Sequence, residues 1–122
     1  MWDAEVDVIV AGAGGGGLVA ALSAAQAGLQ VALFEKTEHI LGNTAASAGM
    51  IPAAGTRFQK EHGIEETPED MAEDIFKKNH YESDKELTLA VCKVSAPLIE
   101  WMYDDLEIEL SLVTEFKYPG HS

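Results

Sequence analysis

The sequence of 122 residues predicts an α/β fold that opens with a strand, a helix and a second strand. Three observations predict it: an apolar run at 6–11, a glycine run that follows at once at 12–17, and a second apolar run at 31–34. Strand and helix signals that alternate along a chain indicate a parallel sheet covered by helices. With 47% hydrophobic residues, the chain can form a real core.

The glycine run predicts a turn that can hold a phosphate. Gly12 permits a tight exit from the first strand, because glycine adopts positive φ without strain. Gly14 has no Cβ to keep the backbone away from a pyrophosphate, and Gly17 lets the next helix lie close to the sheet. Four consecutive glycines, 14–17, exceed what this turn requires. The pattern is the Rossmann-like βαβ fingerprint of a dinucleotide site.

The helix and second strand strengthen this interpretation. The amino end of the helix favours an anion, because its unpaired N–H groups and dipole point toward the turn. Gly28 is expected to end the helix. Glu35 closes the second strand about 20 residues beyond Gly12, the spacing of a carboxylate that binds ribose hydroxyls. Because a carboxylate repels a 2′-phosphate, the pattern predicts FAD or NAD and disfavours NADP.

Two helices are predicted after a loop of small residues at 41–55. Thr67 and Pro68 are typical of an N-cap and a first helical position, and an acidic first turn follows them. Ser83 begins a capping box for the second helix. That helix carries an apolar stripe of helical spacing, which consists of Leu87, Val91 and Val94.

The last third of the chain is expected to hold a third helix and a strand. Ser95 and Pro97 indicate a cap or kink at the start of the helix, whose inward-facing residues would be Leu98, Trp101, Met102 and Leu106. Alternating apolar residues at 108–112 suggest a half-buried strand. Two strong strands and one weak strand are few for a parallel sheet. We therefore expect an incomplete domain, either an amino-terminal piece of a larger protein or a module completed by another chain.

Charge and composition exclude several classes of partner. A net charge of −13 argues against nucleic acid and anionic membrane surfaces. The stretch from Val8 to Phe34 lacks charge, but its glycines fit a strand–turn–helix–strand unit better than a membrane span.

Cys92 is the only cysteine, which fits a reducing compartment, and we expect a cytoplasmic protein. No metal site is expected, because the spacing of the histidines is not that of ligands.

A second motif, Leu41-Gly42-Asn43-Thr44-Ala45-Ala46-Ser47-Ala48-Gly49-Met50, adds to the fingerprint. The two motifs together resemble the fumarate reductase/succinate dehydrogenase flavoprotein family, which includes soluble fumarate reductases and 3-ketosteroid dehydrogenases. The resemblance spans essentially the whole chain. It implies the following cofactor-binding residues: Gly12, Gly14, Gly16 and Gly17 at the phosphates, Glu35 on the adenosine ribose, and Asn43, Thr44 and Gly49 near the pyrophosphate and flavin.

The resemblance also implies an organisation and a chemistry. The chain would be the amino-terminal part of an FAD-binding domain, with the fingerprint at 1–36, a flavin loop at 37–66, a helical segment at 67–106, and a strand and truncated loop at 107–122. Its oxidoreductase activity would transfer hydride between flavin N5 and a C–C or C=C bond beside a carboxylate or carbonyl. The substrate would then be a small carboxylate or ketone, and the electron partner is not specified.

Departures from the family pattern qualify this expectation. Leu41 stands where the family usually has a glycine. Asn43 replaces the histidine that bonds covalently to FAD in respiratory members, which implies non-covalent FAD. Arg57, the only arginine, does not match the catalytic arginine of the family and is expected at the surface or near a phosphate. No catalytic residue is therefore assigned. An NAD-binding dehydrogenase domain and a non-catalytic nucleotide-binding module stay as alternatives.

Overall fold

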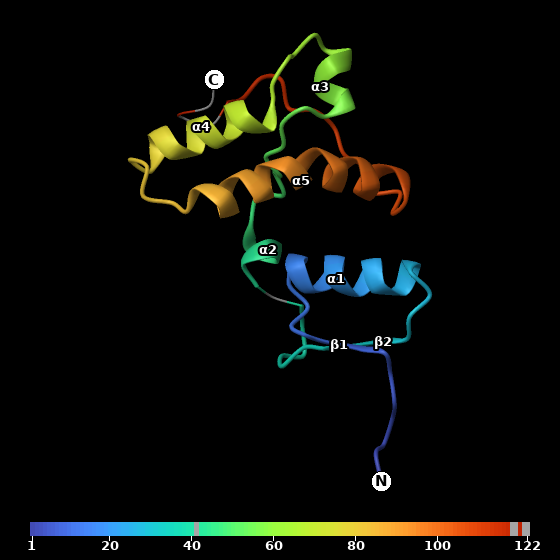
Figure 1. Ribbon diagram of the computed structural model, residues 1–122. Helices are drawn as coiled ribbons and strands as arrows, with labels where there is room; N and C mark the ends of the chain where they lie inside the picture. The colour runs from blue at the N-terminus through green and yellow to red at the C-terminus, as the bar shows by residue number, and fades with distance from the viewer. Residues whose placement is uncertain (41, 118–119, 121–122) are drawn as a thin grey trace. The chain divides into compact units, whose positions relative to one another are not determined.

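The computed structural model describes residues 1–40, 42–117 and 120. The chain divides into two compact units, Met1–Met50 and Ile51–Ser122. The first unit contains β1, α1, β2 and α2, and the second contains α3, α4 and α5 (Figure 1). The boundary between the units falls inside the segment 37–66, which the sequence assigned to one loop.

The first unit is the expected βαβ arrangement. Strand β1 (Val8–Ala11) pairs in parallel with β2 (Val31–Phe34), so that Val8 lies beside Val31 and Ala11 beside Phe34. Helix α1 (Gly15–Gln26) connects the strands and packs on both of them (Figure 1). The predicted helix stop is confirmed: Gly28 has φ +83°, and its N–H donates to the carbonyl of Ala25 at 2.9 Å.

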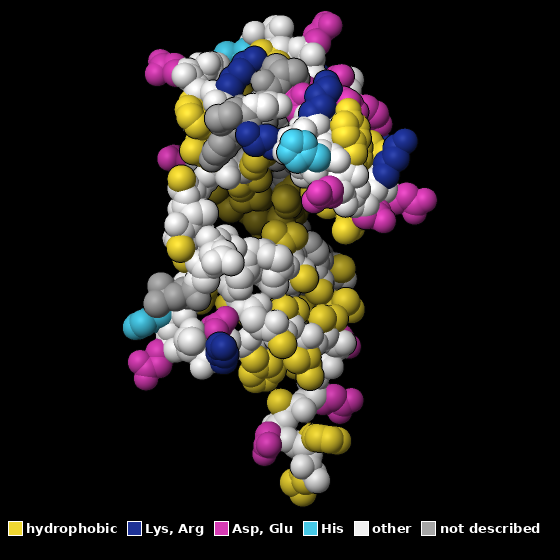
Figure 2. All heavy atoms as spheres, turned by 90° about the vertical axis from the view of Figure 1, so that its left-hand side faces the viewer, with side chains coloured by type: hydrophobic (Ala, Val, Ile, Leu, Met, Phe, Trp, Pro, Cys, Tyr) yellow, Lys and Arg dark blue, Asp and Glu magenta, His cyan; other side chains and the backbone are white. Residues whose placement is uncertain are grey.

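Part of the two-stranded sheet is exposed. Residue Ile9 is 69% exposed and Phe34 is 61% exposed. Figure 2 shows hydrophobic side chains at the surface of the first unit, at the height of the strands in Figure 1. Parallel sheets are normally covered on both faces. The described strands therefore form only part of such a sheet, which fits the expectation of an incomplete domain.

The second unit is a helical hairpin with a short helix beside it. Helix α3 spans Arg57–Glu61, α4 spans Pro68–Lys78 and α5 spans Lys85–Asp104. Helices α4 and α5 pack along each other, and the buried core between them contains Ala72, Phe76 and Cys92.

The predicted cap of α4 is confirmed. The hydroxyl of Thr67 accepts the N–H of Asp70 at 3.1 Å, and the carboxylate of Asp70 accepts the N–H of Thr67 at 2.9 Å. Thr67 and Asp70 thus form a reciprocal capping box, and Pro68 occupies the first helical position.

The start of α5 corrects the predicted cap. Asp84, and not Ser83, is the N-cap, because its carboxylate accepts the N–H of Leu87 at 2.8 Å. The hydroxyl of Ser83 is instead engaged by the side chains of Asn79 and Thr88.

The expected third helix is also wrong as a separate element. Helix α5 continues through Pro97, although proline lacks the N–H that an interior helical position donates. Contacts on both sides of Pro97 hold this helix in place. Before it, the hydroxyl of Ser95 accepts the N–H of Ala54 at 3.2 Å, and after it the buried side chain of Ile99 packs inward.

Two further expectations differ from the structure. The stripe of Leu87, Val91 and Val94 is exposed, with Leu87 at 66%, because α5 turns its other face to α4. The strand expected at 108–112 is absent: within the described residues, 107–117 form neither helix nor strand. Residues 118, 119, 121 and 122 of the expected carboxy-terminal loop lie outside the described part.

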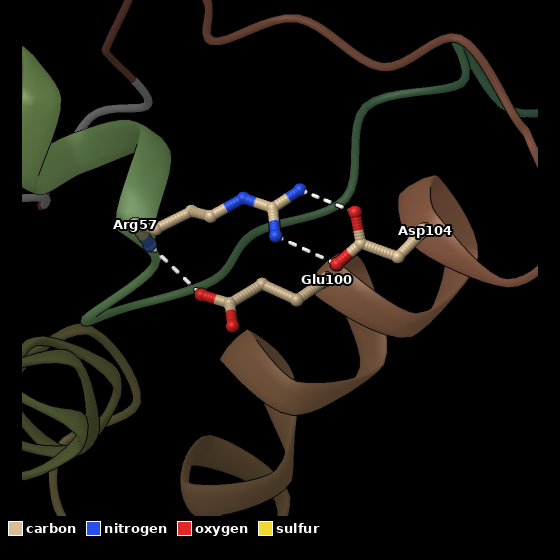
Figure 3. A network of polar contacts seen from close by, with 3 residues as sticks. All are labelled: Arg57, Glu100 and Asp104. Atoms are coloured by element: carbon tan, nitrogen blue, oxygen red, sulfur yellow. Dashed lines mark hydrogen bonds and ion pairs between the residues drawn. The ribbon is translucent and has the colours of Figure 1, made fainter.

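Arg57 fastens α3 to the end of α5 (Figure 3). Its guanidinium donates two hydrogen bonds of 2.6 Å to the carboxylate of Asp104. The backbone N–H of Arg57 donates to the carboxylate of Glu100 at 2.8 Å. The guanidinium also lies 5.0 Å from the ring centre of Phe58 and 5.4 Å from that of Tyr103. The side chain of Arg57 is 40% exposed, as expected for a surface residue, and its positive charge pairs with Asp104 within the second unit.

Candidate functional site

The turn after β1 connects the sheet to α1, and the backbones of the turn and of the first helical turn lie very close together. Gly12 adopts φ +102°, and its N–H donates to the carbonyl of Phe34 at 2.7 Å. A Cβ on Gly17 would lie only 1.9 Å from the carbonyl oxygen of Gly12. Both glycines are therefore required by the backbone geometry, as the sequence predicted. The amino end of α1 lies directly against the strand end.

The outer side of the same turn is open. A Cβ on Gly14, the N-cap of α1, or on Gly16 would meet nothing within 4 Å. The first N–H groups of a helix lack partners within the helix. Backbone N–H groups in the first turn of α1 are therefore accessible to a ligand, because no side chain of the turn covers them.

Gly15, the second of the four consecutive glycines, is explained by a contact that the sequence did not reveal. The N–H of Gly15 donates to the hydroxyl of Thr44 at 3.0 Å. A Cβ on Gly15 would lie 3.1 Å from the same hydroxyl oxygen, which is tighter than ordinary contact. Gly15 thus allows the second motif to approach the amino end of α1.

Glu35 lies beside the glycine turn, one residue past β2. One carboxylate oxygen accepts the N–H of Ala13 at 3.0 Å, and the other accepts the N–H of Thr37 at 3.2 Å. These hydrogen bonds, with that of Ala13 the largest contribution, hold the pKa of Glu35 below its usual range. The carboxylate is therefore fixed and ionised at neutral pH.

The second motif forms the short helix α2 (Asn43–Ala46), which Gly42 precedes as N-cap. Asn43 is exposed at the first position of α2, and Thr44 follows it against Gly15. Gly49 lies three residues beyond α2 with φ +76°, and its N–H donates to the hydroxyl of Ser47 at 3.3 Å. Leu41, the departure from the family pattern, lies outside the described residues.

A hollow of about 230 Å³ lies between these segments, all within the first unit. Among the residues predicted for the site, Gly14, Glu35 and Thr44 line it. Of the described residues, the others of that set do not line it: Gly12 lies in the turn after β1, Gly16 and Gly17 lie in the first turn of α1, and Asn43 and Gly49 belong to the second motif. The remaining lining residues were missed by the sequence analysis; they are Ala13, Leu18, Ile40, Gly42 and Ala45.

The fold and this hollow define the class of dinucleotide-binding domains. A parallel βαβ unit, a glycine turn at a helix amino end and an acidic residue after the second strand are the parts that this class combines. The space over Gly14 and Gly16 and the fixed carboxylate of Glu35 fit a ligand with a diphosphate and a ribose.

Comparisons with known proteins specify the class further. Residues 7–119 match the family model described as FAD binding domain. Urocanate reductase of Eggerthella lenta is 41% identical over 98 residues, which are 80% of this chain and 16% of that protein. Fumarate reductase (cytochrome) of Shewanella frigidimarina is 40% identical over 97 residues, 80% of this chain and 17% of that protein.

Two solved structures resemble the chain. The open conformation of a flavocytochrome c3 fumarate reductase gives a TM-score of 0.84 at 33% identity, over 95% of this chain and 20% of that one. The 3-ketosteroid-Δ4-(5α)-dehydrogenase from Rhodococcus jostii gives 0.74 at 35% identity, over 85% of this chain and 22% of that one.

The chain belongs to the FAD-binding domain family, and its cofactor is FAD. The NAD-binding alternative is therefore wrong. The chain spans less than a quarter of the length of these relatives, so they contain much that the present sequence does not. In the described parts of the chain, none of the helices combines the length and apolar character that crossing a bilayer requires.

Proposed function

We propose that this chain is the FAD-binding region of an oxidoreductase that transfers hydride between the flavin and a C–C or C=C bond beside a carboxylate or carbonyl. The observation that carries the FAD-binding part of the proposal is the position of Glu35, and the proposed reaction follows from the names of the relatives. Its carboxylate is held 3.0 Å from the N–H of Ala13 and lines the same hollow as Gly14 and Thr44. An ionised acceptor fixed at the end of a glycine turn is suited to a ribose next to a diphosphate.

The backbone around Gly14 and Gly16 would hold the diphosphate. The N–H groups of Ala13 and Gly15 already donate to Glu35 and Thr44. The other N–H groups of the first turn of α1 are thus the donors proposed for the phosphate oxygens, and the helix dipole favours the negative charge there. Gly12 and Gly17 would contribute indirectly, by keeping α1 close to β1.

The second motif would meet the pyrophosphate and the flavin. Asn43, Thr44 and Gly49 carry small or polar side chains, or none, which allows a flat ring to come close. The side-chain amide of asparagine is a poor nucleophile, so attachment at Asn43 would be non-covalent. When bound, the flavin supplies the hydride chemistry, and the protein supplies position and charge.

The names of the relatives guide the choice of substrate. Fumarate and urocanate, which two of the relatives reduce by name, both carry a C=C bond conjugated to a carboxylate. We propose a small carboxylate or ketone of this kind as the substrate. Its acid or base catalyst would lie outside the present residues. A cytoplasmic location, in keeping with the single cysteine, is part of the same proposal.

The test is the flavin content of the full-length protein after purification. We expect a yellow protein with an oxidised-flavin absorbance spectrum, from which acid or heat releases all of the flavin as FAD. Flavin that stays with the precipitated protein would contradict non-covalent binding. A colourless protein that gains no flavin when FAD is added would contradict the proposal and favour a non-catalytic nucleotide-binding module.

Activity is tested separately, with reduced flavin and a panel of conjugated acids and ketones. Reoxidation of the flavin by fumarate, urocanate or an enone, with the saturated product detected, would support the proposed hydride transfer. Binding of FAD without reoxidation by any conjugated acid or ketone would contradict the proposed reaction while leaving the cofactor site intact.

A further inference from the structure

Thr37 makes contacts to Glu35 that the fingerprint does not require. Its N–H donates to one carboxylate oxygen of Glu35 at 3.2 Å, and its hydroxyl oxygen lies 3.1 Å from that same oxygen. The hydroxyl also donates to the carbonyl oxygen of His39 at 2.6 Å. Thr37 therefore stands between the carboxylate at the end of β2 and the backbone that leads to Ile40, which lines the hollow.

The chemistry of a hydroxyl makes this arrangement informative. A threonine hydroxyl has one hydrogen, and neither a carbonyl oxygen nor an ionised carboxylate can donate one. The single hydrogen is therefore shared between Glu35 and His39, with the shorter contact to His39. A shift of either acceptor changes the contact to the other. The hydroxyl thus couples the orientation of the carboxylate to the first residues of the segment that follows β2.

The two oxygens of Glu35 have different partners. The backbone N–H of Ala13, in the glycine turn, donates to Oε2, and the backbone N–H of Thr37 donates to Oε1. These two bonds do not require the threonine side chain at position 37. What the threonine side chain adds is the hydroxyl contact to Oε1, which further restrains the orientation of the carboxylate.

We propose that Thr37 is a positioning residue that orients the carboxylate of Glu35 toward the adenosine ribose of FAD. The inference rests on the proposed function, in which Glu35 binds that ribose. Thr37 need not touch the cofactor itself. Thr37 restrains the side chain of Glu35 before FAD binds. Less conformational entropy is then lost when the ribose contact forms.

The test compares Thr37→Val with Thr37→Ser in the full-length protein stripped of its flavin. Valine keeps the branched shape and the backbone N–H but removes the hydroxyl, whereas serine keeps the hydroxyl. We expect Thr37→Val to raise the Kd for FAD about three- to tenfold, the effect of one ordinary hydrogen bond. Thr37→Ser is expected to stay close to the wild type. Thr37→Ala, with the hydroxyl and the branch both removed, is expected to repeat the loss.

ADP distinguishes positioning of the ribose ligand from a general structural role. ADP has the adenosine ribose and diphosphate but no flavin, and its affinity is measured by competition with FAD. We expect Thr37→Val to weaken ADP and FAD by the same factor and to lower the melting temperature of the cofactor-free protein by no more than Glu35→Ala does, because it removes only the hydroxyl contacts to Glu35 and His39. An effect on FAD without one on ADP, failure of serine to rescue, or a larger fall in the melting temperature than Glu35→Ala causes would overturn the inference.

Glu35→Ala is measured in parallel, so that the proposed ribose contact of Glu35 and the positioning role of Thr37 are tested separately. If Glu35→Ala leaves the affinity for FAD unchanged, the proposed ribose contact is wrong and the inference falls with it. If Glu35→Ala weakens FAD and Thr37→Val does not, the ribose contact stands and only the role of Thr37 is wrong.

Discussion

The carbonyl oxygen of Gly12 lies where a side chain on Gly17 would have to be. A Cβ built on Gly17 comes within 1.9 Å of that oxygen, a distance that real Cβ atoms do not show. The contact joins the first residue after β1 to the first turn of α1. Because the carbonyl is backbone, it cannot turn away as a flexible side chain would, and the two elements can approach only while position 17 is glycine.

Gly17→Ala is therefore expected to destabilise the full-length protein and to weaken FAD binding. Forcing a methyl group into a packed contact costs about 1–3 kcal/mol. Thermal unfolding of the cofactor-free protein and titration with FAD measure the two effects.

Gly16→Ala is the matched control, because its Cβ meets nothing within 4 Å. Its unfolding temperature is expected to be unchanged or raised, since alanine favours helix over glycine by about 1 kcal/mol. Its affinity for FAD is nevertheless expected to fall, because position 16 faces the proposed phosphates. Equal stability of Gly17→Ala and Gly16→Ala would show that the close approach at Gly17 is not required.

Replacement of Glu35 is expected to weaken FAD binding. Glu35→Ala removes a charged acceptor, and hydrogen bonds to charged groups correspond to roughly a 10- to 100-fold change in Kd. Glu35→Gln keeps the size of the side chain and removes the charge, so it separates the two contributions. Isothermal titration with FAD measures both variants, and wild-type affinity in Glu35→Ala would mean that the carboxylate faces another partner.

The same carboxylate predicts a dependence of stability on pH. The hydrogen bonds from Ala13 and Thr37 lower the pKa of Glu35 from its ordinary value of 4.5. A group with a lowered pKa stabilises the folded state above the unfolded-state pKa, and this contribution is lost as the pH falls through the folded-state pKa. The difference in melting temperature between wild type and Glu35→Gln is expected to be constant above pH 4.5 and to shrink below it. A difference that does not change with pH would contradict the ionised contact.

The pair of Arg57 and Asp104 is expected to stabilise the second unit through its two-bond geometry. The two hydrogen bonds of 2.6 Å raise the pKa of Arg57 and lower that of Asp104. Arg57→Lys keeps the charge but cannot form the same planar pair. We expect Arg57→Lys to lower the melting temperature nearly as much as Arg57→Gln. A double-mutant cycle with Asp104→Asn is expected to give a favourable coupling that decreases at high salt, and a coupling of zero would show that the pair is not stabilising.

The cap of α4 gives a prediction that does not depend on FAD. Thr67→Ala removes the acceptor for the N–H of Asp70 and is expected to lower stability by about 1 kcal/mol. Thr67→Ser retains a hydroxyl and is expected to keep most of that stability. Chemical denaturation measures both variants, and identical unfolding midpoints for alanine and threonine at position 67 would mean that the cap is not formed in solution.

Local sequence signals predicted those parts of the chain whose geometry depends on nearby residues. The exit at Gly12, the helix stop at Gly28 and the cap at Thr67 each depend on backbone or side-chain groups a few residues away. The family and its cofactor were also predicted, because the fingerprint and the second motif both lie in a short stretch of sequence.

Other parts of the structure depend on residues far apart in the sequence. Helix α5 continues through Pro97, and on either side of this proline Ser95 accepts the N–H of Ala54 and Ile99 is buried, which the local sequence did not predict. The alternation at 108–112 has no neighbouring strand to pair with among the described residues, and a strand requires a partner. The contact of Thr44 with Gly15 joins residues 29 positions apart, which no single motif reveals.

The proposed FAD site is tested most directly by a crystal structure of the full-length protein with FAD. We expect the diphosphate to lie against the backbone at Gly14 and Gly16, with a ribose hydroxyl within hydrogen-bonding distance of the carboxylate of Glu35. A structure in which FAD binds elsewhere, or in which protein side chains fill the hollow between Gly14, Glu35 and Thr44, would contradict it.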